Sequence, residues 1–358
     1  MALSNTCIER IAHEVVATLV ARFATFPEDA SGNRNAPFHE AFLKAFANEL
    51  EGKVSDIPLF ISLSSWLHGL NTTLGQSFFE QVAHIISDGE KREYTSKKLG
   101  NLMITPRQKQ VINQIITDLS VEDRYPNVEE ENGLLFYPHP KEEETVSAID
   151  FSADVFYTVD DKIVAIELKT VKPNSGEMRG EKRKILEGKA ALYNKFVNGQ
   201  SESTQILFYI GFPFDPTSDT PTGFDKSRFF GNIINLSKYF DPNESLIASE
   251  LWDSLAGESG TMQQILDIIN AIATPEFMDR YKFVQDGKNR LIDRERFREI
   301  LQDWFLFSEI IFLDNEELIL TRLPNMKKKF NQLLFNKDGK YQWKRHVDLL
   351  KALNTSAG

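Results

Sequence analysis

The chain of 358 residues contains one cysteine, Cys7. It can therefore form neither an internal disulfide nor a zinc site built on several cysteines, which favours a reducing compartment. No run of about 18 apolar residues, the length that a membrane-spanning helix needs, is present. Glu9 and Glu14 stand where a signal peptide would be apolar. We therefore expect a cytoplasmic protein with no membrane contact.

Several common catalytic motifs are also missing. The six histidines show no His-x-x-x-His or similar metal-ligand spacing, and there is no Gly-x-Ser-x-Gly elbow. The glycine-containing stretch 176–182 lacks the four-residue gap and the Gly-Lys-Ser/Thr ending of a phosphate-binding loop. These absences argue against histidine-ligated metal chemistry, serine hydrolysis and ATP-driven catalysis.

What is present is a globular composition, 41% hydrophobic and 26% charged, with an uneven distribution of charge. The net charge of −11 argues against non-specific coating of nucleic acid. Two segments are nevertheless basic, 172–195 with seven Lys/Arg against three Glu, and 322–345 with eight against one Asp. They could contact an anionic polymer at one defined surface, or they could be solvated helix faces. For the tail from Asn325 we favour buried aromatics with solvated lysines.

Hydrophobic periodicity predicts helices on both sides of a strand-rich segment. We expect one folding unit with a mainly helical region over 1–124, an α/β core over 125–240, and a mainly helical region with a basic tail over 241–358. The expected helices cover 8–26, 38–53, 76–88, 107–119, 181–196, 244–256, 262–273 and 294–312. The expected strands cover 154–159, 162–170 and 205–212.

The first two strands can form a hairpin through a two-residue turn at Asp160-Asp161. Val159 then pairs with Lys162, and Asp154 falls opposite Glu167. Lys169, two residues further along, lies on the same face. Three charged groups thus converge on an apolar strand pair.

Two carboxylates placed across a β-ladder repel each other, and a divalent cation removes that repulsion. Mg²⁺ prefers one or two carboxylates together with water and phosphate oxygens, which Asp154 and Glu167 could provide. Lys169 could orient or deprotonate a nucleophile, so the hairpin favours metal-dependent phosphodiester hydrolysis. The alternative is a surface ion pair, since Glu-x-Lys also occurs at Glu51 and Glu187.

Ala153-Asp154, followed by Glu167-Leu168-Lys169, resembles the PD-(D/E)XK nuclease signature. The resemblance implies an α/β (α+β type) restriction-endonuclease-like core, a mixed central sheet flanked by helices, with large helical N- and C-terminal additions. It also implies that Asp154 and Glu167 are metal ligands and that Lys169 lies beside the attacking water. Ala153 replaces the usual proline, which leaves Asp150 as a rival acid. Asp150 would pair beyond Lys169, so we rank it second.

Residues 75–215 further resemble type II restriction endonucleases of the TdeIII-like group. In related enzymes a glutamate on an early helix joins the active site. The sequence Leu74-Gly75-Gln76-Ser77-Phe78-Phe79-Glu80 resembles that helix and makes Glu80 the candidate. The alternative is that Glu80 is an ordinary exposed helix residue. The resemblance also implies that an Arg-acid-Arg cluster, formed by Arg179, Glu181 and Arg183, recognises a short palindrome with G·C pairs of the GG/CC type. The expected DNA-binding residues are Lys172, Arg179, Glu181, Lys182, Arg183 and Lys184, with plain phosphate contact as the alternative role.

We therefore expect a type II restriction endonuclease that cuts double-stranded DNA with Mg²⁺, with Mn²⁺ able to substitute. A palindromic site favours a homodimer, and a cognate DNA methyltransferase is expected in the same system. Two alternatives remain open. One is a PD-(D/E)XK nuclease of DNA repair or recombination, and the other is a DNA-binding or interaction module without catalysis.

Overall fold

The computed structural model describes residues 3–27, 43, 50–54, 56–140, 142–169, 177–200 and 204–356. The chain divides into two compact units. Unit 1 consists of residues 1–3 and 79–264, and unit 2 consists of residues 4–78 and 265–358. The three-part division of a single unit remains a prediction. No helix in the described part of the chain has the length and apolar character needed to cross a bilayer.

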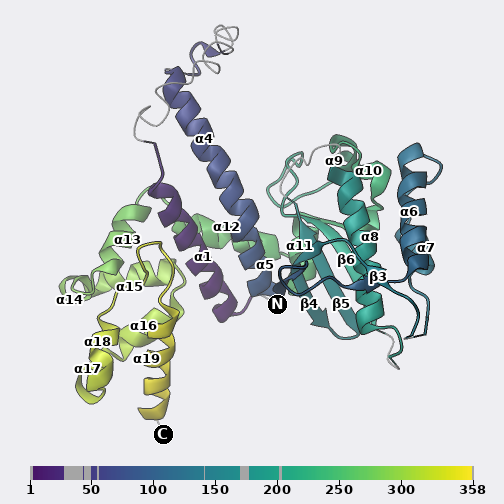
Figure 1. The fold of residues 1–358 in the computed structure, drawn as a ribbon. Coiled ribbons are helices and arrows are strands. Elements are labelled where there is room, and N and C mark those ends of the chain that lie inside the picture. Colours follow the sequence, from purple (N-terminus) through teal and green to yellow (C-terminus); the bar gives the residue numbers. More distant parts are fainter. Residues whose placement is uncertain are drawn as a thin grey trace. The chain divides into compact units, whose positions relative to one another are not determined.

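Unit 1 is built on a five-stranded mixed sheet in the order β1-β4-β5-β6-β7, of which Figure 1 labels β4, β5 and β6. β1 pairs antiparallel with β4 and β4 with β5, whereas β5, β6 and β7 run parallel. This is the expected mixed sheet flanked by helices. The strands are β1 Glu90–Tyr94, β2 Met103–Ile104, β3 Val146–Ser147, β4 Phe151–Val159, β5 Lys162–Leu168, β6 Gln205–Phe212 and β7 Ser245–Ile247, of which β2 and β3 form a separate pair. The helices are α5 Phe79–Ser87, α6 Pro106–Val121, α7 Val128–Leu135, α8 Glu177–Phe196, α9 Lys226–Asn232, α10 Leu236–Tyr239, the 3₁₀ turn η4 Pro242–Glu244 and α11 Ser249–Ala256.

The β4–β5 hairpin has the predicted register. Val159 pairs with Lys162, and the ladder continues to Val155 opposite Ile166. Asp160 has φ 51°, a left-handed conformation that aspartate tolerates better than most residues and that a tight hairpin turn requires. The turn chemistry therefore fixes which side chains of the two strands share a face.

Helices α8 and α11 cover opposite faces of the sheet. A Cβ at Gly188 of α8 would lie 2.6 Å from the ring of Phe208 on β6, so only glycine allows this helix to approach so closely. A Cβ at Gly211, three residues along β6, would instead meet Leu251 of α11 at 3.2 Å. Because side chains alternate along a strand, positions three apart face opposite sides.

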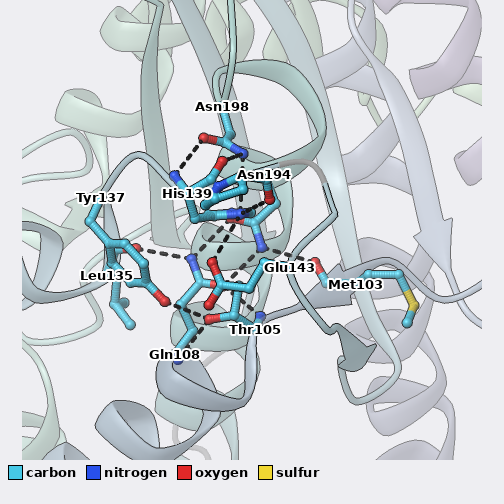
Figure 2. A network of polar contacts seen from close by, with 10 residues as sticks. Met103, Thr105, Gln108, Leu135, Tyr137, His139, Glu143, Asn194 and Asn198 are labelled. Carbon is cyan, nitrogen blue, oxygen red and sulfur yellow. Dashed lines mark hydrogen bonds and ion pairs between the residues drawn. The ribbon is translucent and has the colours of Figure 1, made fainter.

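A network of polar contacts fixes the second half of α8 (Figure 2). Gln108 Nε2 donates to Asn194 Oδ1 of α8 at 3.0 Å and to the Leu135 carbonyl at 3.0 Å. Gln108 also completes a capping box with Thr105 at the start of α6. Asn198 donates to the His139 carbonyl at 3.0 Å. These buried or half-buried bonds hold α8, and with it the acidic residues of its first turns, at a defined position.

Unit 2 is helical. Its elements are α1 Asn5–Phe23, α4 Ile57–Thr73, the π-helical turn η3 Leu74–Phe78, α13 Phe277–Gln285, α14 Asn289–Ile292, α15 Arg294–Asp303, α16 Phe307–Asp314, α17 Glu316–Arg322, α18 Pro324–Phe330 and α19 Trp343–Ser356, with α12 Thr261–Ile272 crossing the boundary between the units. Glu9 of α1 accepts hydrogen bonds from the Ser308 backbone N–H and hydroxyl at 2.8 and 2.7 Å. His13 of α1 stacks on Tyr341, with ring centroids 3.8 Å apart. The N-terminal helix and the C-terminal helices therefore share one core.

Two expected helices are wrong in detail. Residues 245–247, at the start of the helix expected over 244–256, form strand β7 beside β6. The helix expected over 294–312 is two helices, because the chain turns at Phe305, which has φ 56°. The expected helix over 38–53 lies mostly outside the described residues. Strand β1 was not predicted.

Candidate active site

Three predicted residues lie together where β4 and β5 pair. The side chains of Asp154, Glu167 and Lys169 are 11%, 12% and 16% exposed. The Leu168 backbone N–H donates to Asp154 Oδ2 at 3.0 Å across the hairpin. His84 Nε2 of α5 donates to the Asp154 carbonyl oxygen at 2.6 Å. Asp154 is thus held in place through both its side chain and its backbone.

Lys169 lies among carboxylates. Its Nζ is 3.1 Å from Glu167 Oε1 and 3.2 Å from Glu181 Oε1 of α8, with Glu177 Oε1 at 3.9 Å. Burial disfavours the ammonium, but the charges of Glu167 and Glu181 more than offset this and raise the pKa of Lys169. Lys169 is therefore a cation, pre-oriented beside Glu167.

Glu80, the predicted fourth member, is connected to this cluster through a lysine. Lys91 Nζ of β1 lies 3.0 Å from Glu80 Oε1 and 2.9 Å from Asp154 Oδ1. Lys91 was not predicted as a site residue, because the charged stretch 90–94 does not resemble a strand. Burial raises the pKa of Glu80, although the hydrogen bond from Lys91 counteracts part of that effect.

Burial and then the charge of Asp154 raise the pKa of Glu167 to about 7, against the lowering effect of Lys169. Five carboxyl groups face three ammonium groups in this cluster, so two negative charges remain unbalanced when all are ionised. The carboxyl groups belong to Glu80, Asp154, Glu167, Glu177 and Glu181, and the ammonium groups to Lys91, Lys169 and Lys184. One divalent cation would balance them. The described residues contain no group of three or more His, Cys, Asp or Glu side chains arranged to hold a metal ion on their own.

The raised pKa of Glu167 predicts how the stability of the metal-free protein depends on pH. Between its ordinary value of 4.5 and the folded value of about 7, the unfolded chain releases this proton while the folded chain retains it. The group therefore lowers the free energy of unfolding as pH rises, by roughly 3 kcal/mol in total above pH 7. In EDTA, Glu167→Gln should gain several degrees in Tm relative to wild type between pH 5 and pH 8. If the difference in Tm between Glu167→Gln and wild type stays constant across this pH range, the pKa of Glu167 is not raised in the folded protein.

Lys182, expected to bind DNA, is not available for that role. Its side chain is fully buried, and Nζ lies 2.5 Å from Glu131 Oε2 and 2.5 Å from Glu244 Oε2. Lys189, two turns further along α8, also pairs with Glu244. Burial disfavours the charged form of Lys182, but these two glutamates raise its pKa above the ordinary value. The four groups form a closed ionic network inside unit 1.

Glu181, which was expected to contact DNA bases, is instead engaged inside the protein. Its side chain is 5% exposed and is directed at Lys169, with Lys184 Nζ 2.9 Å from the same oxygen. Arg179 is exposed, and Arg183 is half-buried with Glu187 at 3.8 Å. Lys172 lies outside the described residues. Arg179, Arg183 and Lys184 therefore remain candidates for contact with DNA.

Asp150, ranked second as a metal ligand, precedes β4 and accepts a hydrogen bond from Asn101 Nδ2 at 2.6 Å. In the tail, Phe330, Phe335 and Tyr341 are buried, as predicted, whereas Trp343 is exposed. Arg345 is buried as well and pairs with Glu309, so it is not part of a basic surface.

The family model of the type II restriction endonuclease HinfI matches residues 3–273. The chain belongs to this family. It is also 42% identical, over 99% of its length and 99% of the relative's, to the type II restriction enzyme MjaII of Methanocaldococcus jannaschii.

Membership of the HinfI family confirms the predicted type II restriction endonuclease, a site-specific deoxyribonuclease whose substrate is DNA. The matched family is that of HinfI, whereas the resemblance seen in the sequence was to the TdeIII-like group of type II restriction endonucleases. The match over 3–273 includes every residue of the β4–β5 hairpin and of α8.

Proposed function

We propose that this endonuclease hydrolyses the phosphodiester bonds of double-stranded DNA with Mg²⁺, or Mn²⁺ in its place, held by Asp154 and Glu167. The observation that carries the proposal is the convergence of these two buried carboxylates with Lys169 on one hairpin. Carboxylate oxygens are the protein ligands that Mg²⁺ prefers, and the surplus of two negative charges fits one such ion. When bound, it would supply charge neutralisation at the phosphate and a more acidic water.

The chain's own residues orient the reactants. Lys169, held between Glu167 and Glu181, presents an ammonium group beside the carboxylate pair. It can donate a hydrogen bond to the attacking water or to a phosphate oxygen. The Leu168 N–H fixes one oxygen of Asp154, so the carboxylate keeps its orientation. Glu80 joins the site through Lys91.

Specificity is proposed to come from the start of α8. Arg179 is exposed two residues before Glu181, so the helix that contacts the catalytic lysine also carries a side chain able to read guanine O6 and N7. We assign Arg179 and Arg183 to G·C pairs of a short palindrome of the GG/CC type, and Lys184 to phosphates.

Arg179→Ala should weaken binding to the cognate site by about 10- to 100-fold while changing binding to other DNA much less. Arg179→Lys is the matched control, because it retains the charge but loses the bidentate contact. Competition binding between cognate and unrelated duplexes measures the ratio of the two affinities, which is the specificity. If Arg179→Lys retains full specificity, Arg179 contacts phosphate only.

The function is tested by incubating plasmid DNA with the protein and Mg²⁺. Discrete fragments that disappear in EDTA are expected, and sequencing their ends gives the recognition site and the position of the cut. A smear, or nicks confined to branched DNA, would favour a nuclease of repair or recombination. A plasmid left uncut across metals and sequences would refute the proposal.

A palindromic site requires two equivalent readers, so the enzyme is proposed to act as a homodimer. Sedimentation with a cognate duplex should give two chains per duplex. A DNA methyltransferase that protects the same site is proposed as its partner in the cell, and an adjacent gene of that kind would support the pairing.

A further inference from the structure

A register shift between β1 and β4 aims Lys91 at Asp154. Glu90 pairs with Phe156, but Arg92 pairs with Ala153. One residue of β1, Lys91, therefore lies opposite two residues of β4, Asp154 and Val155. Such bulges bend a strand and re-aim a side chain, and they are enriched next to active sites. The local backbone is thus arranged so that this lysine reaches the site from the edge of the sheet.

Lys91 bridges the two acidic groups on its side of the cluster. Its Nζ contacts Glu80 Oε1 at 3.0 Å and Asp154 Oδ1 at 2.9 Å, while the side chain remains 36% exposed. The other oxygen of Asp154, Oδ2, accepts from the Leu168 N–H. Both oxygens of this carboxylate are therefore engaged, one by a fixed backbone group and one by a movable ammonium.

An ion bound by Asp154 would meet the positive charge of Lys91 at the oxygen that is not held by the backbone. Like charges a few ångströms apart repel strongly in a partly buried site. The lysine stem is flexible and partly solvated, so the ammonium can withdraw towards water. The carboxylates of Glu80 and Asp154 would then be shared with the ion instead of with Lys91.

We propose that Lys91 is a built-in counter-cation that occupies the Glu80–Asp154 side of the metal position and that a divalent ion must displace. The inference rests on the proposed metal role of Asp154. Lys91 is a positioning residue that keeps the acidic cluster ordered and charge-compensated without metal, at the expense of metal affinity. A purely structural ion pair would affect stability but not the competition with the ion.

The test is Mn²⁺ binding without DNA, measured by electron paramagnetic resonance on the full chain. Lys91→Met retains length but removes the charge, and Lys91→Arg retains the charge. Lys98→Met is the matched control, because Lys98 is 61% exposed and pairs with Glu93 at 3.5 Å. Lys91→Met should lower the Kd for Mn²⁺ by about tenfold or more. The Kd of Lys91→Arg for Mn²⁺ should remain within about threefold of the wild-type value. The Kd of Lys98→Met should equal the wild-type value.

A second readout is Tm in EDTA and in Mn²⁺. Lys91→Met should melt a few degrees below wild type in EDTA, because Glu80 and Asp154 then repel each other, and should gain more from Mn²⁺. An unchanged or higher Kd for Mn²⁺ in Lys91→Met overturns the inference, as does an absence of Mn²⁺ binding in both proteins. Cleavage by Asp154→Asn is assayed separately. If Asp154→Asn is inactive while Lys91→Met binds Mn²⁺ like wild type, only the inference on Lys91 fails.

Discussion

Glu167→Gln is expected to lower the single-turnover rate constant of DNA cleavage by roughly 10³-fold or more. The amide removes the charge that would balance a divalent ion, and it is a weaker ligand. Lys169→Ala should cost roughly 10²- to 10⁴-fold, because the ammonium group that orients the attacking water or a phosphate oxygen is lost. Both rate constants are measured on a plasmid with one site in saturating Mg²⁺.

The control for these variants is Glu51→Gln, since Glu51-Gly52-Lys53 repeats the Glu-x-Lys spacing on an exposed segment. It should cleave like wild type. DNA affinity, measured by fluorescence anisotropy in EDTA, should change little in Glu167→Gln and Lys169→Ala, which separates catalysis from binding. Cleavage at the wild-type rate by either variant would contradict the assignment of that residue to catalysis.

The second large effect is on stability. Glu244→Ala should destabilise unit 1 by about 3–5 kcal/mol, because it leaves the buried ammonium groups of Lys182 and Lys189 short of their shared partner. The expected fall in Tm is about 10 °C or more. Differential scanning calorimetry measures it directly.

Glu129→Ala on α7 is the matched control, because this glutamate is exposed on the helix that carries Glu131. Its effect should stay below about 1 kcal/mol. If Glu244→Ala melts like Glu129→Ala, the ionic network does not carry the stability assigned to it.

The hairpin was predictable because its information is local. The turn at Asp160-Asp161 sets the register, and the register alone brings Asp154, Glu167 and Lys169 to one face. Glu80 was found only through a resemblance. The structure connects it to the hairpin through Lys91, and no local pattern marks a contact made through a third element.

The errors on α8 have a physical cause. The sequence shows four consecutive charged residues over 181–184, and such residues normally lie on a solvated helix face. Here Glu181 and Lys182 are buried because each meets opposite charges from other elements, Lys169 for the first and Glu131 and Glu244 for the second. Burial of paired charges depends on the tertiary fold, so the charged cluster alone led to the expectation that these two side chains face DNA.

The same limit applies to β1 and to the terminal helices. Charged residues fill most of 90–94, and the segment is a strand only because β4 lies beside it. Residues 4–78 and 265–358 fold into one unit through contacts such as Glu9 with Ser308, which sequence patterns do not encode.

The central claim is that Asp154 and Glu167 hold the catalytic ion, and an anomalous difference map from crystals grown with Mn²⁺ and a cognate duplex tests it most directly. The account predicts a manganese peak bounded by carboxylate oxygens of both residues, absent in crystals of Asp154→Asn. A peak that contacts neither residue, in crystals whose DNA is cut, would contradict it.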